Sequence, residues 1–180
     1  MNKIAVVTGG SGGIGRCTAA SLKAAGCTVY EISRRDIPSD GIIHMSADVT
    51  DEAQVRRVID EIAAREGRID ILVNNAGFGI SGAAELTESR DSHAQLELNV
   101  FGTDNVTRAV LPHMRAQGGG RIVCMSSIAG IVPIPFQLWY SVSKAAIIAY
   151  VLALQNEVRP FGISVCAIMP GDIASGFTDA

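Results

Sequence analysis

Short apolar runs rich in β-branched residues alternate along the whole chain with longer stretches whose apolar residues recur at helical spacing. The short runs suit strands buried on both faces, and the longer stretches suit helices with one apolar face. This alternation predicts an α/β fold of three layers, a doubly wound parallel sheet with helices on both faces. The six expected strands are Ile4 to Thr8, Thr28 to Ile32, Ile42 to Met45, Ile69 to Asn74, Arg121 to Ser126 and Ile163 to Met169.

Stop signals follow the stretches of helical spacing. Gly26, Gly67, the run Gly118 to Gly120 and the pair Pro160/Gly162 stand where helices should end. The expected helices are Ile14 to Ala25, Asp51 to Arg65, His93 to Arg115 and Tyr140 to Val158, with a weaker short one from Thr87 to Asp91.

The length of 180 residues suits one domain, and no repeat, linker or charge block divides the chain. We therefore expect a single domain over residues 1–180. After the last strand the chain runs from Pro170 to Ala180 in small and polar residues, with no closing element. The sequence thus predicts a domain that is incomplete at its C-terminus.

Composition and charge argue against several classes of protein. The chain is 48% hydrophobic and 18% charged, with a net charge of -3, so it lacks the basic footprint of a protein that binds nucleic acid or an anionic membrane. Its longest unbroken apolar run, Ala145 to Leu154, is shorter than the ~18 residues of a membrane span. We expect a cytoplasmic protein whose four cysteines, Cys17, Cys27, Cys124 and Cys166, are small, buried and reduced.

A glycine-rich turn follows the first strand and opens a helix. A pyrophosphate needs backbone N–H groups at close range and the positive end of a helix dipole, and side chains in the turn would keep it away. An ordinary tight turn would also use glycine, but this position after a buried strand favours a dinucleotide site in a Rossmann-type fold. The expected contacts are Gly9, Ser11, Gly12, Gly13, Ile14 and Gly15.

The end of the second strand indicates which dinucleotide is bound. An acid there would bind a free ribose 2′-hydroxyl, whereas a base would bind a 2′-phosphate. Ser33 occupies the position of the acid and Arg34 follows it, which favours NADP over NAD, unless both arginines of this turn are merely solvated and Asp36 neutralises one. After the third strand, Asp48 and Val49 could contact the adenine, although Asp48 could equally cap the next helix.

Tyr140 and Lys144 begin the last long helix, and their i,i+4 spacing places both on one helical face. A free phenol, with a pKa near ~10, exchanges protons poorly at neutral pH. Lowering that pKa to ~7 requires about 4 kcal/mol, which a lysine and an oxidised nicotinamide could supply together. Such a pair is a general acid/base, although the same spacing also occurs where a helix has a core side and a solvated side.

Taken together, these motifs resemble the short-chain dehydrogenase/reductase family over essentially the whole chain. Its T-G-x-x-x-G-x-G pattern is matched by Thr8, Gly9, Gly13 and Gly15, and its Y-x-x-x-K pattern by Tyr140 and Lys144. The family's serine falls thirteen residues before the tyrosine, on Ser127 rather than Ser126. The remaining matches are the N-N-A-G segment from Asn74 through Asn75 and Ala76 to Gly77, the helix asparagine Asn99, and the Pro170–Gly171 pair followed by Ile173.

The resemblance implies a Ser-Tyr-Lys-Asn proton relay. Tyr140 would protonate a carbonyl oxygen that Ser127 orients, Lys144 would lower the pKa of Tyr140 and bind the nicotinamide ribose, and Asn99 would hold a water. The segments Asn75–Gly77 and Pro170–Ile173 would contact the cofactor. The resemblance further implies that a last strand and a substrate lid are missing from this chain.

The resemblance therefore implies an NADP-dependent oxidoreductase that interconverts a secondary alcohol and a ketone. It also implies a homodimer formed through the two long helices, which carry apolar residues suited to the contact: Val106, Val110, Ile147, Ile148 and Val151. The alternative is a nucleotide-binding regulator or scaffold without turnover. A hydrophobic carbonyl substrate is expected from apolar loop residues, which could instead simply cover the sheet: Phe78, Ile80, Ile131, Ile134, Phe136, Leu138 and Trp139.

Overall fold

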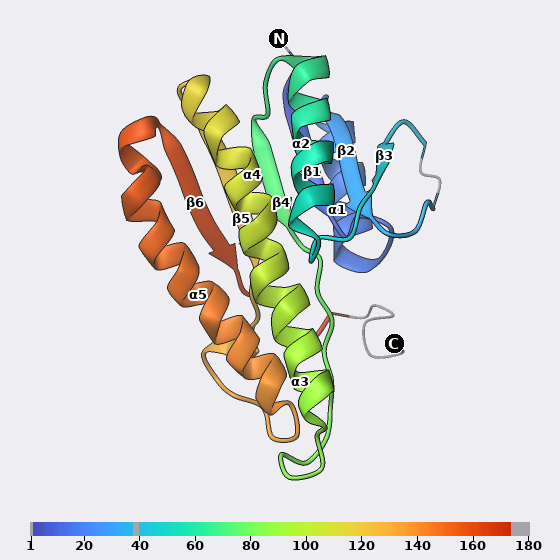
Figure 1. Cartoon of the computed structure of the whole chain (residues 1–180), viewed down its shortest axis with the longest axis vertical. Helices are drawn as coiled ribbons and strands as arrows, with labels where there is room; N and C mark the ends of the chain where they lie inside the picture. Colours follow the sequence, from blue (N-terminus) through green and yellow to red (C-terminus); the bar gives the residue numbers. More distant parts are fainter. Residues whose placement is uncertain (1, 38–39, 174–180) are drawn as a thin grey trace.

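A computed structural model describes residues 2–37 and 40–173 of the chain. Within them, six parallel strands form one sheet in the order β3-β2-β1-β4-β5-β6, which confirms the predicted α/β architecture (Figure 1). Because the strand order reverses between β1 and β4, the loops after these two strands diverge and leave a crevice at the carboxyl edge of the sheet. The strands are β1 Ile4–Thr8, β2 Thr28–Ser33, β3 Ile43–Ser46, β4 Ile71–Asn74, β5 Gly120–Met125 and β6 Ile163–Ile168.

β1 has its predicted boundaries, and those of the other strands differ from the predicted ones by one or two residues. β4 begins at Ile71 rather than Ile69, because the Gln117 side chain binds both backbone groups of Ile69: its Oε1 accepts from Ile69 N at 3.0 Å and its Nε2 donates to Ile69 O at 2.7 Å. The amide thus replaces a neighbouring strand at this residue. The central strand β1 is buried along its whole length.

Helices cover both faces of the sheet. The helices α2 (Glu52–Glu66), α4 (Gly102–Ala116) and α5 (Leu138–Val158) lie on one face, and α1 (Gly13–Ala24) lies on the other (Figure 1). The larger core lies between the sheet and the three-helix layer, and the smaller core joins α1 to β1 and β2. On the α1 face, β6 exposes Ser164, Cys166 and Ile168 in the described part of the chain.

The predicted short helix at Thr87–Asp91 and the long helix at His93–Arg115 are one continuous helix. It begins as α3 (Ser89–Leu96), passes through a π-helical turn η1 (Glu97–Phe101) and continues as α4. The prediction of two helices was wrong because the helix continues through Ser92, whose hydroxyl donates to Ser89 O of the same helix. The π turn does not break the helix either, since it only adds a residue to one turn. Asn99, at the centre of that turn, is buried.

α5 and the turn that follows it, Leu138–Phe161, are long and apolar enough to span a bilayer by length and composition alone, a test that core helices of soluble proteins also pass. One side of α5 packs on the sheet, with Ile147, Val151, Leu154 and Val158 buried. This placement corrects the assignment of a partner-contacting role to Ile147 and Val151, and the same holds for Val106 and Val110 of α4: all four fill this chain's own core.

The expectation of four buried cysteines was wrong for three of them. Cys124 is buried on β5, Cys27 is half-buried, and Cys17 and Cys166 are exposed on α1 and β6. All four are free thiols, as expected. The sequence misled here because α1 and β6 each have a face that no described residue covers, and apolar neighbours in the sequence do not reveal which face a cysteine occupies.

The packing at the start of α1 predicts a stability difference between two glycines. A Cβ on Gly15 would collide with the Gly9 carbonyl and the Asn75 amide, whereas a Cβ on Gly12 meets nothing within 4 Å. We expect Gly15→Ala to lower the free energy of unfolding by about 1–3 kcal/mol. Gly12→Ala should lower it less, by about 0.5 kcal/mol, because alanine fits the extended backbone without a clash and loses only the preference of the N-cap for glycine over alanine.

Urea unfolding followed by circular dichroism measures both values. Equal losses of stability in the two variants would contradict the tight approach of α1 to the turn.

Candidate active site

The glycine-rich turn lies at the carboxyl end of β1, where the strand order reverses. Gly9 and Gly13 have φ angles of 66° and 51°, which side chains rarely permit. The N-cap of α1, Gly12, makes no side-chain hydrogen bond to the first turn. Within the described part of the chain, a Cβ on Gly12 would meet no atom within 4 Å, and the first N–H groups of a helix have no partner inside the helix, an arrangement that fits a bound pyrophosphate.

The segment after β4 is tied to this turn. The Thr8 hydroxyl accepts from the backbone N–H groups of Asn75 and Ala76, both at 3.0 Å. The Asn75 side chain donates to Thr8 O at 3.1 Å and Gly9 O at 3.3 Å. Asn75 and Ala76, both expected at the cofactor, thus hold together the two loops that border the crevice.

The end of β2 places the predicted selectivity residues together. Arg34 is exposed and pairs with Asp48 across 3.8 Å. Partial burial raises the pKa of Asp48, but two hydrogen bonds from Thr50 and the Arg34 charge outweigh burial and leave that pKa below its ordinary value. Asp51 Oδ1 accepts from Gln54 N at 3.0 Å and caps α2, so the alternative role of Asp48 as the helix cap was wrong. Val49 is buried beside Gly102.

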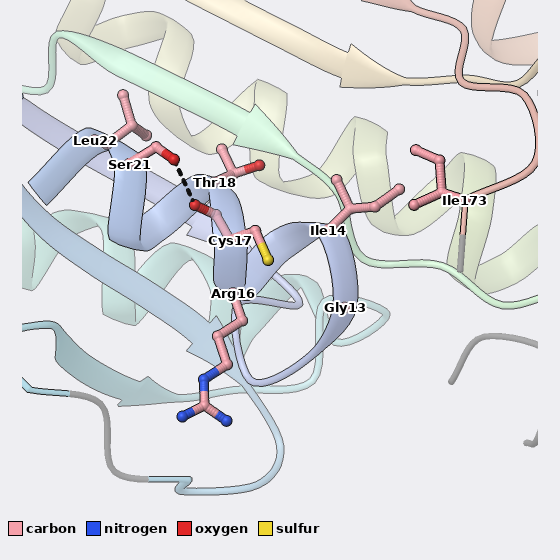
Figure 2. A pocket seen from close by; sticks show the side chains of 8 residues that line it. All are labelled: Gly13, Ile14, Arg16, Cys17, Thr18, Ser21, Leu22 and Ile173. Carbon is pink, nitrogen blue, oxygen red and sulfur yellow. Dashed lines mark hydrogen bonds between the residues drawn. The ribbon is translucent and has the colours of Figure 1, made fainter. Parts of the chain in front are cut away.

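A hollow of 680 Å³ lies beside α1, between the glycine-rich turn and the segment after β6. Figure 2 shows Ile14 and Ile173, which the sequence assigns to the cofactor, at one end of it. The same segment is tied to the loop after β5, since Pro170 O accepts from Ile128 N at 3.0 Å and a Cβ on Gly171 would lie 3.1 Å from Ile128. The predicted contacts Pro170, Gly171 and Ile173 therefore lie at the same edge as the glycine turn.

Tyr140 and Lys144 lie in the first two turns of α5. The Lys144 Nζ is 5.6 Å from the centroid of the Tyr140 ring and donates to Met125 O at 2.8 Å. Lys144 is only 6% exposed, and burial lowers the pKa of this lysine to about 8. Gly77 lies between two relay residues, because a Cβ there would stand 3.7 Å from Lys144 Nζ and 2.9 Å from Asn99 Oδ1.

The Asn99 side chain binds the backbone of the segment after β4. Its Oδ1 accepts from Phe78 N at 3.0 Å, and its Nδ2 donates to Phe78 O at 2.9 Å and to Ser143 Oγ at 3.0 Å. The Ser143 hydroxyl in turn donates to Tyr140 O at 2.7 Å. Ser143 therefore links Asn99 to the helical turn of the tyrosine, a role that the sequence analysis missed, although a hydroxyl one residue before Lys144 was a signal.

Ser126 and Ser127 differ as expected. The Ser126 hydroxyl is buried and donates to Lys144 O at 2.7 Å, which is a structural role. Ser127 begins the loop between β5 and α5, and its Oγ accepts from Ala129 N at 3.1 Å. A Cβ on Gly130 would lie 2.8 Å from the Lys144 backbone, so this loop approaches α5 closely. Ser127, Tyr140, Lys144 and Asn99 are therefore held by elements that contact one another.

Apolar side chains are exposed on the loop between β5 and α5. Ile131, Ile134 and Leu138 are 63%, 43% and 44% exposed, and Phe136 is 69% exposed with a φ of 63°. Phe136 O accepts from Gly82 N at 2.8 Å, which connects this loop to the segment after β4. Phe78, Ile80 and Trp139 are half-buried. The expected apolar surface therefore lies next to Tyr140 in the chain.

Burial of Lys144 predicts a pH dependence of stability. Its pKa in the folded chain, about 8, is below the ordinary lysine value of 10.5, so folding disfavours the charged form. The destabilisation is complete below pH 8 and disappears as the pH rises toward 10.5. We expect Lys144→Met to raise the free energy of unfolding by about 1–3 kcal/mol at pH 7, and by progressively less at pH 8.5 and pH 9.5.

Urea unfolding of wild type and variant at the three pH values measures this difference. The exposed lysine of the N-terminal segment provides the control, since Lys3→Met should follow wild type throughout. If the free energies of unfolding of Lys144→Met and wild type differ by the same amount at all three pH values, burial does not disfavour the charged form of Lys144.

Comparisons with known proteins agree with this geometry. The family model described as short chain dehydrogenase matches residues 3–180. The 3-ketodihydrosphingosine reductase of Bacteroides thetaiotaomicron is 44% identical over 178 residues, 98% of this chain and 66% of that protein. This chain thus spans about two thirds of the length of that relative.

Solved structures have the same fold. A short-chain dehydrogenase from Streptomyces avermitilis has a TM-score of 0.92 and 39% identity, covering 97% of this chain and 67% of its own. ElxO with NADP bound has a TM-score of 0.93 and 32% identity, covering 97% of this chain and 75% of its own. The strand order, the tyrosine–lysine pair and the match over residues 3–180 together show that the chain belongs to the short-chain dehydrogenase family.

Proposed function

We propose that this protein is an NADP-dependent oxidoreductase that interconverts a secondary alcohol and a ketone. The observation that carries the proposal is the buried Lys144 one helical turn from Tyr140, with Asn99 held against the same site by Phe78 and Ser143. A buried cation beside a phenol stabilises the phenolate and makes the phenol a useful acid/base near neutral pH.

The residues divide the work of carbonyl reduction. Tyr140 gives its phenolic proton to the carbonyl oxygen, and Ser127 donates a hydrogen bond that orients the same oxygen. The ammonium of Lys144 stabilises the phenolate that remains, and Asn99 holds the path by which Lys144 is reprotonated. When bound, the nicotinamide supplies the hydride, while the protein supplies the proton and the orientation.

The choice of NADP rests on Arg34. Its guanidinium is exposed beyond the end of β2 and can bind a 2′-phosphate through two N–H groups. Asp48 pairs with it at 3.8 Å and would hold it near the adenosine end of the site. The NADP-bound structure of ElxO, 32% identical, supports the same choice.

We infer that the substrate is a ketone with a long apolar chain. The exposed Ile131, Ile134, Phe136 and Leu138 provide an apolar surface beside the relay. The similarity to 3-ketodihydrosphingosine reductase, at 44% identity, favours an acyl-chain ketone over a compact polar one.

A homodimer through the outer faces of α4 and α5 accompanies this proposal. The helix α5 is apolar on both sides, and Val142 and Leu152 on its outer side are 42% and 55% exposed. Phe101, before α4, is 54% exposed. These residues, rather than the core residues of the two helices, would contact the second copy. We also propose a cytoplasmic location for the enzyme.

Replacing the phenol tests the reaction. We expect Tyr140→Phe to lower kcat for reduction of a 3-ketoacyl substrate by at least about 100-fold, because the proton donor is lost. NADPH binding, followed by its fluorescence, should persist. Tyr150→Phe is the matched control, since Tyr150 bonds to Asp104 between α5 and α4 and should leave kcat within about threefold.

If wild type binds NADPH but turns over no ketone of a panel, the protein is a regulator or scaffold rather than an enzyme. Full activity of Tyr140→Phe would contradict the proposed relay, in which Tyr140 is the proton donor.

Replacing the guanidinium tests the cofactor. We expect Arg34→Ala to lower kcat/KM for NADPH by about 10-fold or more while kcat/KM for NADH changes little, because only NADPH carries the 2′-phosphate. Arg35→Ala, one residue further along an exposed turn, is the control. If the ratio of kcat/KM for NADPH to kcat/KM for NADH is unchanged in Arg34→Ala, the proposal that Arg34 selects NADP is contradicted.

A further inference from the structure

A buried acid and a half-buried histidine lie side by side beneath the adenosine end of the site. Glu31 on β2 is 2% exposed and lies opposite His44 of β3 in the parallel register. The His44 Nδ1 and Glu31 Oε1 are hydrogen-bonded. Ser33 Oγ is 3.2 Å from the same oxygen and 2.9 Å from Arg35 O, so its single proton serves one of them at a time.

The second carboxylate oxygen has no partner. Among the described residues, Glu31 Oε2 and His44 Nε2 are buried without a hydrogen bond. A buried polar atom without a partner costs free energy, and a buried carboxylate costs more, so its retention calls for an explanation. The imidazolium form would leave an N–H unpaired at Nε2, whereas the neutral form that donates through Nδ1 leaves only a lone pair there.

The unpartnered oxygen lies against the glycine-rich turn. A Cβ on Gly10 would be 2.7 Å from Glu31 Cβ and 3.2 Å from Glu31 Oε2. The absence of a side chain at Gly10 therefore lets the carboxylate lie directly under the backbone that would carry the ribose. Ser33 lies two residues after Glu31 on the same face of β2, and Arg34 follows it directly in the chain.

The charged groups on neighbouring elements leave the Glu31 charge uncancelled. Lys23 of α1 pairs with Asp40 at 3.4 Å, and Arg34 pairs with Asp48 at 3.8 Å. Arg16 of α1 lines a hollow with Lys23 and Ile42. Among the described residues, no lysine or arginine forms an ion pair with Glu31, and its one paired side chain is that of His44.

We propose that Glu31 is a specificity-determining residue whose buried charge opposes the 2′-phosphate that Arg34 attracts. The inference rests on the proposed cofactor site. Through the turn, Glu31 repels a doubly charged 2′-phosphate and leaves a 2′-hydroxyl unaffected, so the chain discriminates less strongly between NADPH and NADH than Arg34 alone would make it.

Binding of two adenine nucleotides isolates this effect from catalysis. Adenosine 2′,5′-bisphosphate and AMP differ only at the 2′ position, and calorimetric titration of the purified protein at low salt gives the ratio of their Kd values. We expect Glu31→Gln to favour the bisphosphate by a further 3- to 10-fold or so at pH 8, because the amide keeps the shape and removes the charge.

A second substitution tests the same charge. Glu31→Met removes the charge together with the hydrogen bond to His44 and should shift the Kd ratio toward the bisphosphate by a similar factor at pH 8. Asp60→Asn is the control, since it removes one negative charge from an exposed carboxylate of α2 that pairs with His113, far from this turn in the sequence, and should leave the ratio within about twofold of wild type.

The outcomes separate the two proposals. A Kd ratio unchanged in a folded Glu31→Gln overturns the inference and leaves the cofactor site intact. If Glu31→Gln does not fold, the comparison of Glu31→Met with wild type at pH 8 decides alone, and identical ratios overturn the inference. Failure of wild type to bind either nucleotide, NADPH or NADH overturns the proposed function and, with it, the inference.

Discussion

The hydroxyl of Thr8 holds together the two halves of the site. It accepts two N–H groups, from Asn75 and Ala76, at the point where the strand order reverses. One side of this junction continues into the glycine turn and α1, and the other continues through Gly77 to Phe78, whose backbone positions Asn99. A threonine at the end of β1 thus determines how the phosphate half and the proton-transfer half meet.

The proton-transfer half depends on burying a cation. Lys144 is almost fully buried and, among the described residues, donates to a backbone carbonyl, that of Met125. The cost is met by the surrounding core, in which α5 packs along β5 and β6, and by the close approach of Gly130 to the same helical turn. The same burial that destabilises the fold makes the lysine charge effective beside Tyr140, because low dielectric strengthens the interaction.

Much of this arrangement could be predicted from the sequence. The six strands and the glycine turn follow from local patterns, because a buried parallel strand needs an unbroken apolar run and a phosphate turn needs glycine. The π turn at Asn99 could not be predicted, since it arises from contacts with Phe78 and Ser143, which lie far away in the sequence. The choice of Asp51 rather than Asp48 as the cap of α2 could not be predicted either, because both acids stand near the start of that helix. The pairing of Glu31 with His44 depends on the register of β2 against β3, which local patterns do not give.

Two side chains near the end of β2 act in opposite directions on the proposed cofactor. Glu31 is buried and lies against Gly10 of the glycine-rich turn, whereas Arg34, three residues later, is exposed and pairs with Asp48. Screening by solvent weakens the exposed Arg34, whereas burial leaves the field of Glu31 largely unscreened. A single buried charge can therefore offset an exposed one of opposite sign at the same ligand atom, and the identity of the residue after the strand is an incomplete guide to cofactor choice.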